Sequence, residues 1–277
     1  MERLHLASFL IWKGFNRMRQ YKSENLTVFQ SVLYQTTSAV VQTKRAIILT
    51  DPNWLPNEID EIKAYIQSII EDRKLFIIYT HSDYDHIIAA GAFPNATTIA
   101  SEAFVNRPDK EKVLEEIRQF DAQYYIQRDY PVIYPTIDIV IKDDGQTVEL
   151  EDVSCTFYLA PGHTKDGIFT VVEPYGILLA GDYLSNVEFP FIEDWDSYKN
   201  TLQKAAAIIS DKKIQTLVPG HGRVTNDFME IQKRVDESML YLNNLVMGID
   251  QEEVLRNQYP FYKGLKELHE LNKKIAK

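Results

Sequence analysis

Short apolar runs separated by polar breaks dominate the first third of the chain. They are rich in Val, Ile, Thr, Tyr and Phe, which predicts strands over residues 25–35, 38–43 and 45–51. Pro52 and Pro56 then mark a turn. Isoleucines recur every three or four positions over residues 58–70, and this period predicts an amphipathic helix. The continuous apolar run at residues 74–80 is typical of a buried strand.

The second half repeats this arrangement of strands followed by helices. Apolar runs predict strands at residues 137–142, 147–150, 154–160, 167–172, 175–180 and 214–219. Helical patterns cover residues 101–126 (with a break at Pro108), 196–211, 227–248 and 264–277. Two strand-rich halves, each with its own helices, predict two sheets packed face to face with helices outside. We expect a single domain over residues 1–277, with residues 228–277 as a C-terminal helical extension of it.

Composition narrows the range of partners. The formal net charge is -10 and the pI is near 5.2, which disfavours nucleic acid and anionic membranes as main partners. The basic stretch at residues 12–22 is read as a short solvated segment. No apolar run, including the one at residues 4–12, approaches the roughly 20 residues of a spanning helix. We therefore expect a cytoplasmic protein that acts on a small molecule. A homodimer is possible, but the sequence does not decide this.

The single cysteine, Cys155, excludes an intrachain disulfide bond. It lies in an apolar strand-like run, so we interpret it as a core residue and not as a nucleophile.

Residues that commonly bind metals gather at the ends of four predicted strands. The hexapeptide HSDYDH, residues 81–86, follows one strand directly. His163, Asp182 and His221 each follow another strand and stand beside a glycine, which lets the backbone turn sharply. Four such loops on one rim could converge on one cleft.

Each residue also has an ordinary structural interpretation. A histidine after Pro-Gly is usually a turn residue, and Asp83 or Asp85 could cap a helix that begins near Ile87. These interpretations require the same coincidence at four strand ends, so we favour a metal site. The two remaining histidines, His5 and His269, lie outside any such context and are read as surface or packing residues.

The motifs HSDYDH, PGHT, GD and PGHG, in this order, resemble the metallo-β-lactamase superfamily. The signature of that family is His-x-His-x-Asp-His followed by a His, an Asp and a His, and the resemblance runs from about Val28 to about Val224. It implies an α+β fold, a four-layer αββα sandwich of two mixed β-sheets with helices on the outside. It also implies a metallo-hydrolase. Asp51 resembles the structural aspartate of the family, although a turn former before Pro52 is an alternative.

The resemblance implies two adjacent metal sites. The first would consist of His81, Asp83 and His163, the second of Asp85, His86 and His221, and Asp182 would bridge them. Imidazole and carboxylate ligands suit zinc, with iron or manganese as alternatives. Two divalent ions about 3.5–4 Å apart hold a water between them and lower its pKa.

The expected activity is therefore attack of a metal-bridging hydroxide on a small ester, lactone, thioester or related substrate. Asp85 is the candidate catalytic residue, because it can orient the nucleophile and move a proton. Tyr183 and Lys165 stand next to predicted ligands and could contact substrate, or could simply face solvent. Phe189, Pro190 and Phe191 could form an apolar wall of the cleft, or could belong to the core.

Asp83 departs from the family signature, which has histidine at this position. It could ligate normally, ligate weakly, or leave a single-metal enzyme. We favour ligation, which would tilt preference from zinc towards iron or manganese and make the bridging water less acidic. The flavodiiron branch of the family has a glutamate there, so a diiron redox protein is an alternative function. That alternative would need a separate reductase, because the helical residues after His221 cannot form a flavin domain. A non-catalytic metal-binding protein is a third possibility.

Overall fold

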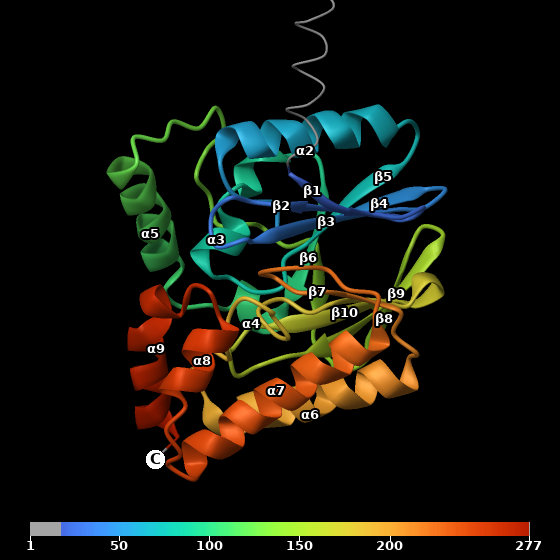
Figure 1. Ribbon diagram of the computed structural model, residues 1–277. Coiled ribbons are helices and arrows are strands. Elements are labelled where there is room, and N and C mark those ends of the chain that lie inside the picture. Colours follow the sequence, from blue (N-terminus) through green and yellow to red (C-terminus); the bar gives the residue numbers. More distant parts are fainter. Residues whose placement is uncertain (1–17, 277) are drawn as a thin grey trace, which may run out of the picture.

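Two β-sheets pack face to face between outer helices in the computed structural model, which describes residues 18–276 (Figure 1). The seven strands of the first sheet, in spatial order, are β1 (Arg19–Lys22), β2 (Leu26–Gln30), β3 (Thr37–Gln42), β4 (Ala46–Thr50), β5 (Lys74–Ile78), β6 (Thr97–Ser101) and β7 (Ile139–Ile141). The five strands of the second sheet are β12 (Thr216–Val218), β11 (Ile177–Leu179), β10 (Ile168–Val172), β9 (Val153–Leu159) and β8 (Gln146–Leu150). Both sheets mix parallel and antiparallel pairs, which confirms the predicted α+β fold.

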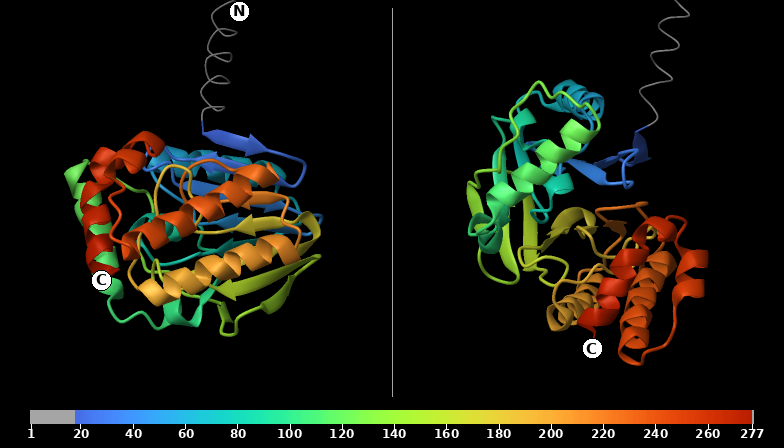
Figure 2. Two further views of the ribbon diagram at one scale, coloured as in Figure 1. Left: turned by 60° about the horizontal axis from the view of Figure 1, so that its bottom comes forward. Right: turned by 90° about the vertical axis from the view of Figure 1, so that its left-hand side faces the viewer.

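Helices cover the outer face of each sheet (Figure 2). Around the first sheet are α2 (Pro56–Ile69), α3 (Tyr84–Ile87), α4 (Glu102–Val105) and α5 (Lys110–Gln123). On the second sheet are α6 (Trp195–Asp211), α7 (Phe228–Val246), α8 (Glu252–Gln258) and α9 (Tyr262–Ile275). Two short 3-10 turns complete the elements, η1 (Ala90–Ala92) and η2 (Glu173–Tyr175).

The central strand β4 shows how the sequence divides between two cores. Ala46 and Ile48 pack into the cluster between the sheets, whereas Ile47 and Leu49 pack against the helices that cover the first sheet. Successive side chains of a strand point to opposite faces, so a continuous apolar run is required where both faces are buried. Cys155 is buried in the cluster between the sheets, which confirms its interpretation as a core residue.

The structure differs from the predicted elements in a few places. The strand predicted over residues 25–35 ends at Gln30, and a loop with positive φ at Tyr34 (52°) and Gln35 (53°) leads into β3. Strands β1 and β6 and helix α8 were not predicted. The apolar run at residues 4–12, His5 and most of the basic stretch lie outside the described residues. Within residues 18–276, no helix has both the length and the apolar character needed to cross a bilayer.

Candidate metal centre

The predicted ligands lie at one edge of the sandwich because the strands that carry them end there. Strands β4 and β5 are parallel, and so are β11 and β12. His81 follows β5, while Asp182 and His221 follow β11 and β12. Gly220 is required at this point, because a Cβ atom there would collide with Asp182 Oδ1. A glycine therefore lets the loop that carries His221 approach Asp182 closely.

Asp182 lies at the centre of the cluster. Its Oδ1 is 3.0 Å from His86 Nε2, and its Oδ2 is 3.2 Å from the Nε2 atoms of both His163 and His221. His81 Nε2 is 3.7 Å from the same Oδ2. One carboxylate therefore faces four imidazoles that come from three separate segments of the chain.

The other two predicted carboxylates divide the imidazoles into two groups. Asp83 Oδ2 lies 3.3 Å from His163 Nε2 and 3.6 Å from His81 Nε2. Asp85 Oδ2 lies 3.4 Å from His221 Nε2 and 3.6 Å from His86 Nε2. Within each group of three, the candidate ligand atoms all lie within 4.8 Å of one another. The structure therefore brings all seven residues together in the grouping that the resemblance implies.

Hydrogen bonds on the far side of each ring fix the tautomer of three histidines. His86 Nδ1 lies 3.0 Å from Asp51 Oδ2, and His163 Nδ1 lies 3.0 Å from the carbonyl oxygen of Phe191. His221 Nδ1 lies 3.0 Å from the carbonyl oxygen of Tyr34. These oxygens only accept, so Nδ1 carries a proton, and Nε2 is the atom whose lone pair faces the cluster when the ring is neutral.

The fourth imidazole, that of His81, is oriented through the hydroxyl group of Thr80. His81 Nδ1 is 3.1 Å from Thr80 Oγ1, and that hydroxyl donates its own proton to Asp51. Asp51 also accepts the backbone N–H of Thr80 at 2.8 Å. The buried carboxylate of Asp51 therefore supports two rings, His86 directly and His81 through Thr80.

We expect Asp51→Asn to weaken metal binding by about 10- to 100-fold, since partners that orient a ligand typically contribute that much. The amide can present its N–H instead of an oxygen to His86 Nδ1, which disfavours the required tautomer. Competition with a chromophoric chelator measures the affinity. An affinity equal to that of an exposed control, Asp72→Asn, would contradict this role.

The structure disfavours helix capping as the explanation of Asp83. This residue occupies the N-cap position of α3, yet its side chain makes no capping hydrogen bond. Its Oδ1 faces Arg107, whose Nη1 is 3.9 Å away. Arg107 Nη1 donates to the backbone carbonyl of Ser82 at 3.1 Å and to the Ser82 hydroxyl group at 2.7 Å. These two hydrogen bonds hold Arg107 in place. A positive charge therefore stands beside the carboxylate that replaces histidine.

The donor set fits divalent cations. Among residues 18–276, His81 Nε2, His163 Nε2 and Asp182 Oδ1 are buried without a hydrogen-bond partner. Buried polar atoms rarely lack partners, and these three point into the same cluster. Nitrogen and carboxylate oxygen are the ligands that zinc, iron and manganese accept.

The charges in the cluster also indicate that it binds cations. Although burial favours neutral rings, Asp182 and neighbouring carboxylates raise the pKa of His86 and His163 well above the ordinary value. They raise the pKa of His221 to about 10 against the same opposing effect of burial. The pKa of Asp182 falls well below its ordinary value despite burial, because His221, His86 and His81 stabilise its charge. Without cations, these carboxylates retain protons on the imidazoles.

This protonation predicts how the stability of the metal-free protein depends on pH. The folded-state pKa of His221 is raised from 6.5 to about 10, so its stabilising contribution is complete below pH 6.5 and is lost as pH rises through 10. We expect the Tm of chelated protein to fall by about 5 °C or more between pH 6.5 and 9.5. The Tm of metal-loaded protein should fall less over the same pH range, because the cations replace those protons. Parallel Tm curves for the two forms would refute the expectation.

The structure places Tyr183 in neither of its two expected settings, and for Phe189 it confirms the alternative of core packing. The hydroxyl of Tyr183 accepts the backbone N–H of His163 at 3.1 Å and donates to the carbonyl of Pro161 at 2.9 Å. Tyr183 therefore positions the His163 loop and does not face substrate. Phe189 is 2% exposed and packs in the helical core, whereas the partly buried ring of Phe191 lies 6.3 Å from the ring of His163.

Arg107 and Glu188 are the functional candidates that sequence reasoning missed. Glu188 Oε1 lies 3.9 Å from His221 Nδ1, and burial raises the pKa of this carboxyl to about 7. Neither residue stands in a recognisable motif, so only the folded structure reveals their position. Arg107 and the exposed Lys165 also line a cavity of about 590 Å³ beside the His163 loop, together with Thr164, Asp166 and Glu193.

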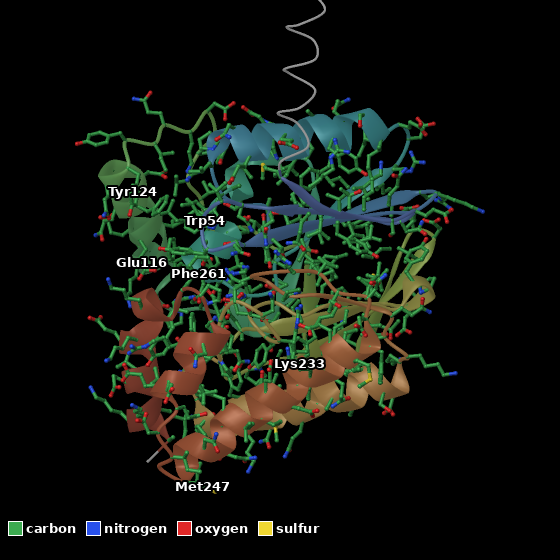
Figure 3. All side chains as sticks on the ribbon, in the orientation of Figure 1. Trp54, Glu116, Tyr124, Lys233, Met247 and Phe261 are labelled. Carbon is green, nitrogen blue, oxygen red and sulfur yellow. The ribbon has the colours of Figure 1, made fainter. Side chains whose placement is uncertain are left out.

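Aromatic residues pack around the β2–β3 loop, whose Tyr34 carbonyl orients the ring of His221. Trp54, which is labelled in Figure 3, is fully buried. Its ring lies 5.6 Å from that of Tyr34 and 4.7 Å from that of Phe120. Its indole N–H donates to Thr36 Oγ1 at 2.7 Å. The carbonyl that fixes His221 is therefore carried by a packed segment, although the Tyr34 side chain itself is 55% exposed.

Residues 32–221 match the family model of the metallo-β-lactamase superfamily. The chain belongs to this superfamily. A metallo-β-lactamase type 2 from Bacillus sp. (strain 170) is 24% identical over 208 residues, covering 72% of this chain and 71% of the relative. An atrochrysone carboxyl ACP thioesterase from Aspergillus chevalieri is 31% identical over 84 residues, covering 30% of this chain and 26% of the relative. The names of both relatives agree with the expected metallo-hydrolase.

Solved structures share the fold at low identity. A metallo-β-lactamase family protein from Thermus thermophilus has a TM-score of 0.57 and 18% identity, covering 81% of this chain and 82% of that one. The sec-alkylsulfatase Pisa1 from Pseudomonas sp. has a TM-score of 0.63 and 12% identity over 82% of this chain. The chain spans only 42% of that sulfatase.

Proposed function

We propose that this superfamily hydrolase uses two divalent metal ions to cleave a small ester, lactone, thioester or related substrate. The observation that carries the proposal is the convergence of four Nε2 atoms within 3.0–3.7 Å of the Asp182 carboxylate. His81, Asp83 and His163 would hold one ion. Asp85, His86 and His221 would hold the other, and Asp182 would bridge the two.

When bound, such a pair of ions supplies an acidified water and a Lewis acid that polarises the electrophile. The remaining chemistry belongs to the protein. Asp85 stands on the first turn of α3, beside His86 and His221, and is nearly buried. From there its carboxylate can orient the nucleophile, accept a proton from it, and return that proton to the leaving group.

The surroundings of the cluster support a small substrate with polar and apolar parts. The cavity lined by Arg107 and Lys165 adjoins Asp83 and His163 on one side. The β2–β3 loop, whose Tyr34 carbonyl contacts His221, exposes the side chains of Val32 (77%) and Tyr34 (55%). A polar group of the substrate would enter the cavity, while an apolar group would contact the loop.

Elemental analysis combined with a substrate panel tests the proposal. Protein purified without added metal should contain close to two divalent ions per chain. It should hydrolyse at least one carboxylic ester, lactone, thioester or phosphodiester in the panel, and chelation should abolish that turnover. Metal-free protein with full turnover would overturn the proposal.

Asp83→His tests the identity of the native metal. We expect the variant to shift metal content towards zinc and to lower the acidic pKa of the pH–rate profile by about one unit, because an anionic ligand is removed. Metal content by mass spectrometry and the pH dependence of kcat/KM measure the two effects. If both remain unchanged, Asp83 is not a ligand. Asp109→His is a suitable control, because Asp109 contacts the same Arg107 from outside the cluster.

Diiron redox chemistry is the second candidate function, favoured by the carboxylate of Asp83 among the ligands of the first site. Coloured, iron-loaded protein without hydrolytic activity would support this second function. The single-domain organisation, the C-terminal helical extension, the cytoplasmic location and the possible homodimer all stay predictions.

A further inference from the structure

A second cavity lies at the opposite end of the strands that carry the metal ligands. It has a volume of about 630 Å³, within the range of small-molecule sites. Its floor includes Ile177 and Thr216, the first residues of β11 and β12. Asp182 and His221 follow the other ends of these two strands, so the cavity is separate from the candidate metal centre.

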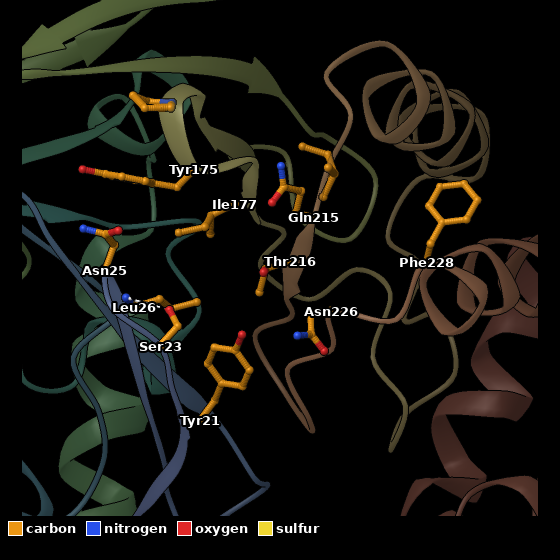
Figure 4. Close-up of a pocket in the computed structure, with 12 residues that line it drawn as sticks. Tyr21, Ser23, Asn25, Leu26, Tyr175, Ile177, Gln215, Thr216, Asn226 and Phe228 are labelled. Carbon is orange, nitrogen blue, oxygen red and sulfur yellow. Dashed lines mark hydrogen bonds between the residues drawn. The ribbon is translucent and has the colours of Figure 1, made fainter.

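Both sheets contribute to this cavity. Tyr21, Ser23 and Asn25 come from the hairpin of β1 and β2, while Gln215, Asn226 and Phe228 come from segments that flank β12. Strands β1 and β12 are the edge strands of their sheets, and the cavity lies between them. Figure 4 shows the two sets of side chains on opposite sides of the opening.

The lining carries no formal charge. The twelve residues are Tyr21, Ser23, Asn25, Leu26, Pro174, Tyr175, Ile177, Ile214, Gln215, Thr216, Asn226 and Phe228. A quarter of the whole chain is charged, so an uncharged lining on the surface of this protein is a distinguishing feature. An anionic ligand would lose hydration here without gaining an opposite charge.

Several polar groups of the lining are available to a ligand. Asn25 Nδ2 donates to the carbonyl of Gln42 at 3.0 Å, and Ser23 Oγ accepts from the backbone of Leu26 at 3.2 Å. The hydroxyl groups of Tyr21, Tyr175 and Thr216 and the amides of Gln215 and Asn226 have no hydrogen-bond partner among residues 18–276. Hydroxyl and amide groups both donate and accept, which matches the hydroxyl groups of a sugar.

Aromatic rings supply part of the apolar lining. Tyr21, Tyr175 and Phe228 come from three different segments, and Phe228 is 55% exposed. Such rings offer a flat apolar face next to polar groups, and the C–H face of a pyranose ring can pack against it. A nucleobase stacks on such rings as well, but it carries no hydroxyl groups to match the polar groups of the lining.

We propose that this cavity, lined by three aromatic rings and by free hydroxyl and amide groups without any charge, is a binding site for a neutral saccharide.

Saturation-transfer NMR and calorimetry on the full chain test the proposal. The probes are maltose, cellobiose and lactose, with glucose 6-phosphate, galacturonate, adenosine and uridine for comparison. We expect at least one neutral disaccharide to bind with a Kd of about 1–10 mM, and the charged probes to bind more weakly. The double variant Gln215→Ala with Asn226→Ala should weaken that binding about tenfold, since it removes two hydrogen-bonding side chains.

Two controls separate this site from the metal centre and from non-specific binding. Gln119→Ala changes an exposed glutamine on α5 and should leave saccharide binding intact. The double variant should retain wild-type metal content and turnover, so failure of this proposal and failure of the proposed hydrolase are distinguishable. Absence of binding by every neutral saccharide overturns the proposal. Tighter binding of a nucleoside or a charged probe, or binding that the double variant leaves unchanged, overturns it as well.

Discussion

Asp182→Asn should remove both metal ions and reduce kcat/KM by at least about 1,000-fold, which corresponds to roughly 4 kcal/mol of lost transition-state stabilisation. The reason is geometric, because this single carboxylate contacts all four imidazoles of the cluster. An amide keeps the size of the side chain. It has only one oxygen, however, and its NH₂ group would face a ring nitrogen or a cation.

Metal content by mass spectrometry and turnover on the best substrate of the panel measure this effect. Asp72→Asn is the control, because Asp72 is exposed in the turn before β5. Circular dichroism should show that the variant is folded, since the buried charge of Asp182 is removed along with the cations that it balances. Two retained ions and near-normal turnover in the variant would refute the bridging role.

Asp85→Asn should reduce kcat by about 100- to 10,000-fold, the range that general acid–base groups typically contribute. At least one metal ion should remain bound, because His86 and His221 are unchanged and an amide oxygen can still ligate. The variant keeps a side chain of the same shape 3.4–3.6 Å from the two rings, but it cannot accept a proton.

A comparison at saturating metal separates the two roles of Asp85. If the residue only ligates, added metal should restore kcat. If it also moves a proton, kcat should stay low while KM changes little, and the pH–rate profile should lose one limb. Full recovery with added zinc, iron or manganese would contradict the catalytic role.

The sequence predicted the architecture because both sheets bury strands on two faces. Runs such as residues 46–49 must then be apolar throughout, and this pattern is visible without a structure. Strand β1 is an edge strand with the sequence RQYK and is partly exposed, so it lacks that pattern. Strand β6 contains a single large apolar residue, Ile99. Such elements are stabilised by their neighbours more than by their own composition.

The ligands were predictable because their side chains define them. Histidine is scarce in this chain. Three of its six histidines lie just after strands, and His86 lies on the short helix α3 that follows β5. The groups that orient these rings carry no such signature. Two of them are backbone carbonyls, from Tyr34 and Phe191, which any residue type could supply. Arg107 reaches Asp83 from the loop after α4, a contact that depends on tertiary structure alone.

The distribution of the ligands along the chain has a consequence for the protein in the cell. The side chains that hold or orient the proposed ions extend from Asp51 to His221, so no partly folded chain presents the whole set. Cations would bind the native state far better than the unfolded chain, and they would stabilise it by about 4 kcal/mol at a concentration of roughly 1,000 Kd. Scarcity of the metal would then shorten the lifetime of the polypeptide itself, and abundance of the protein would follow supply of the ion.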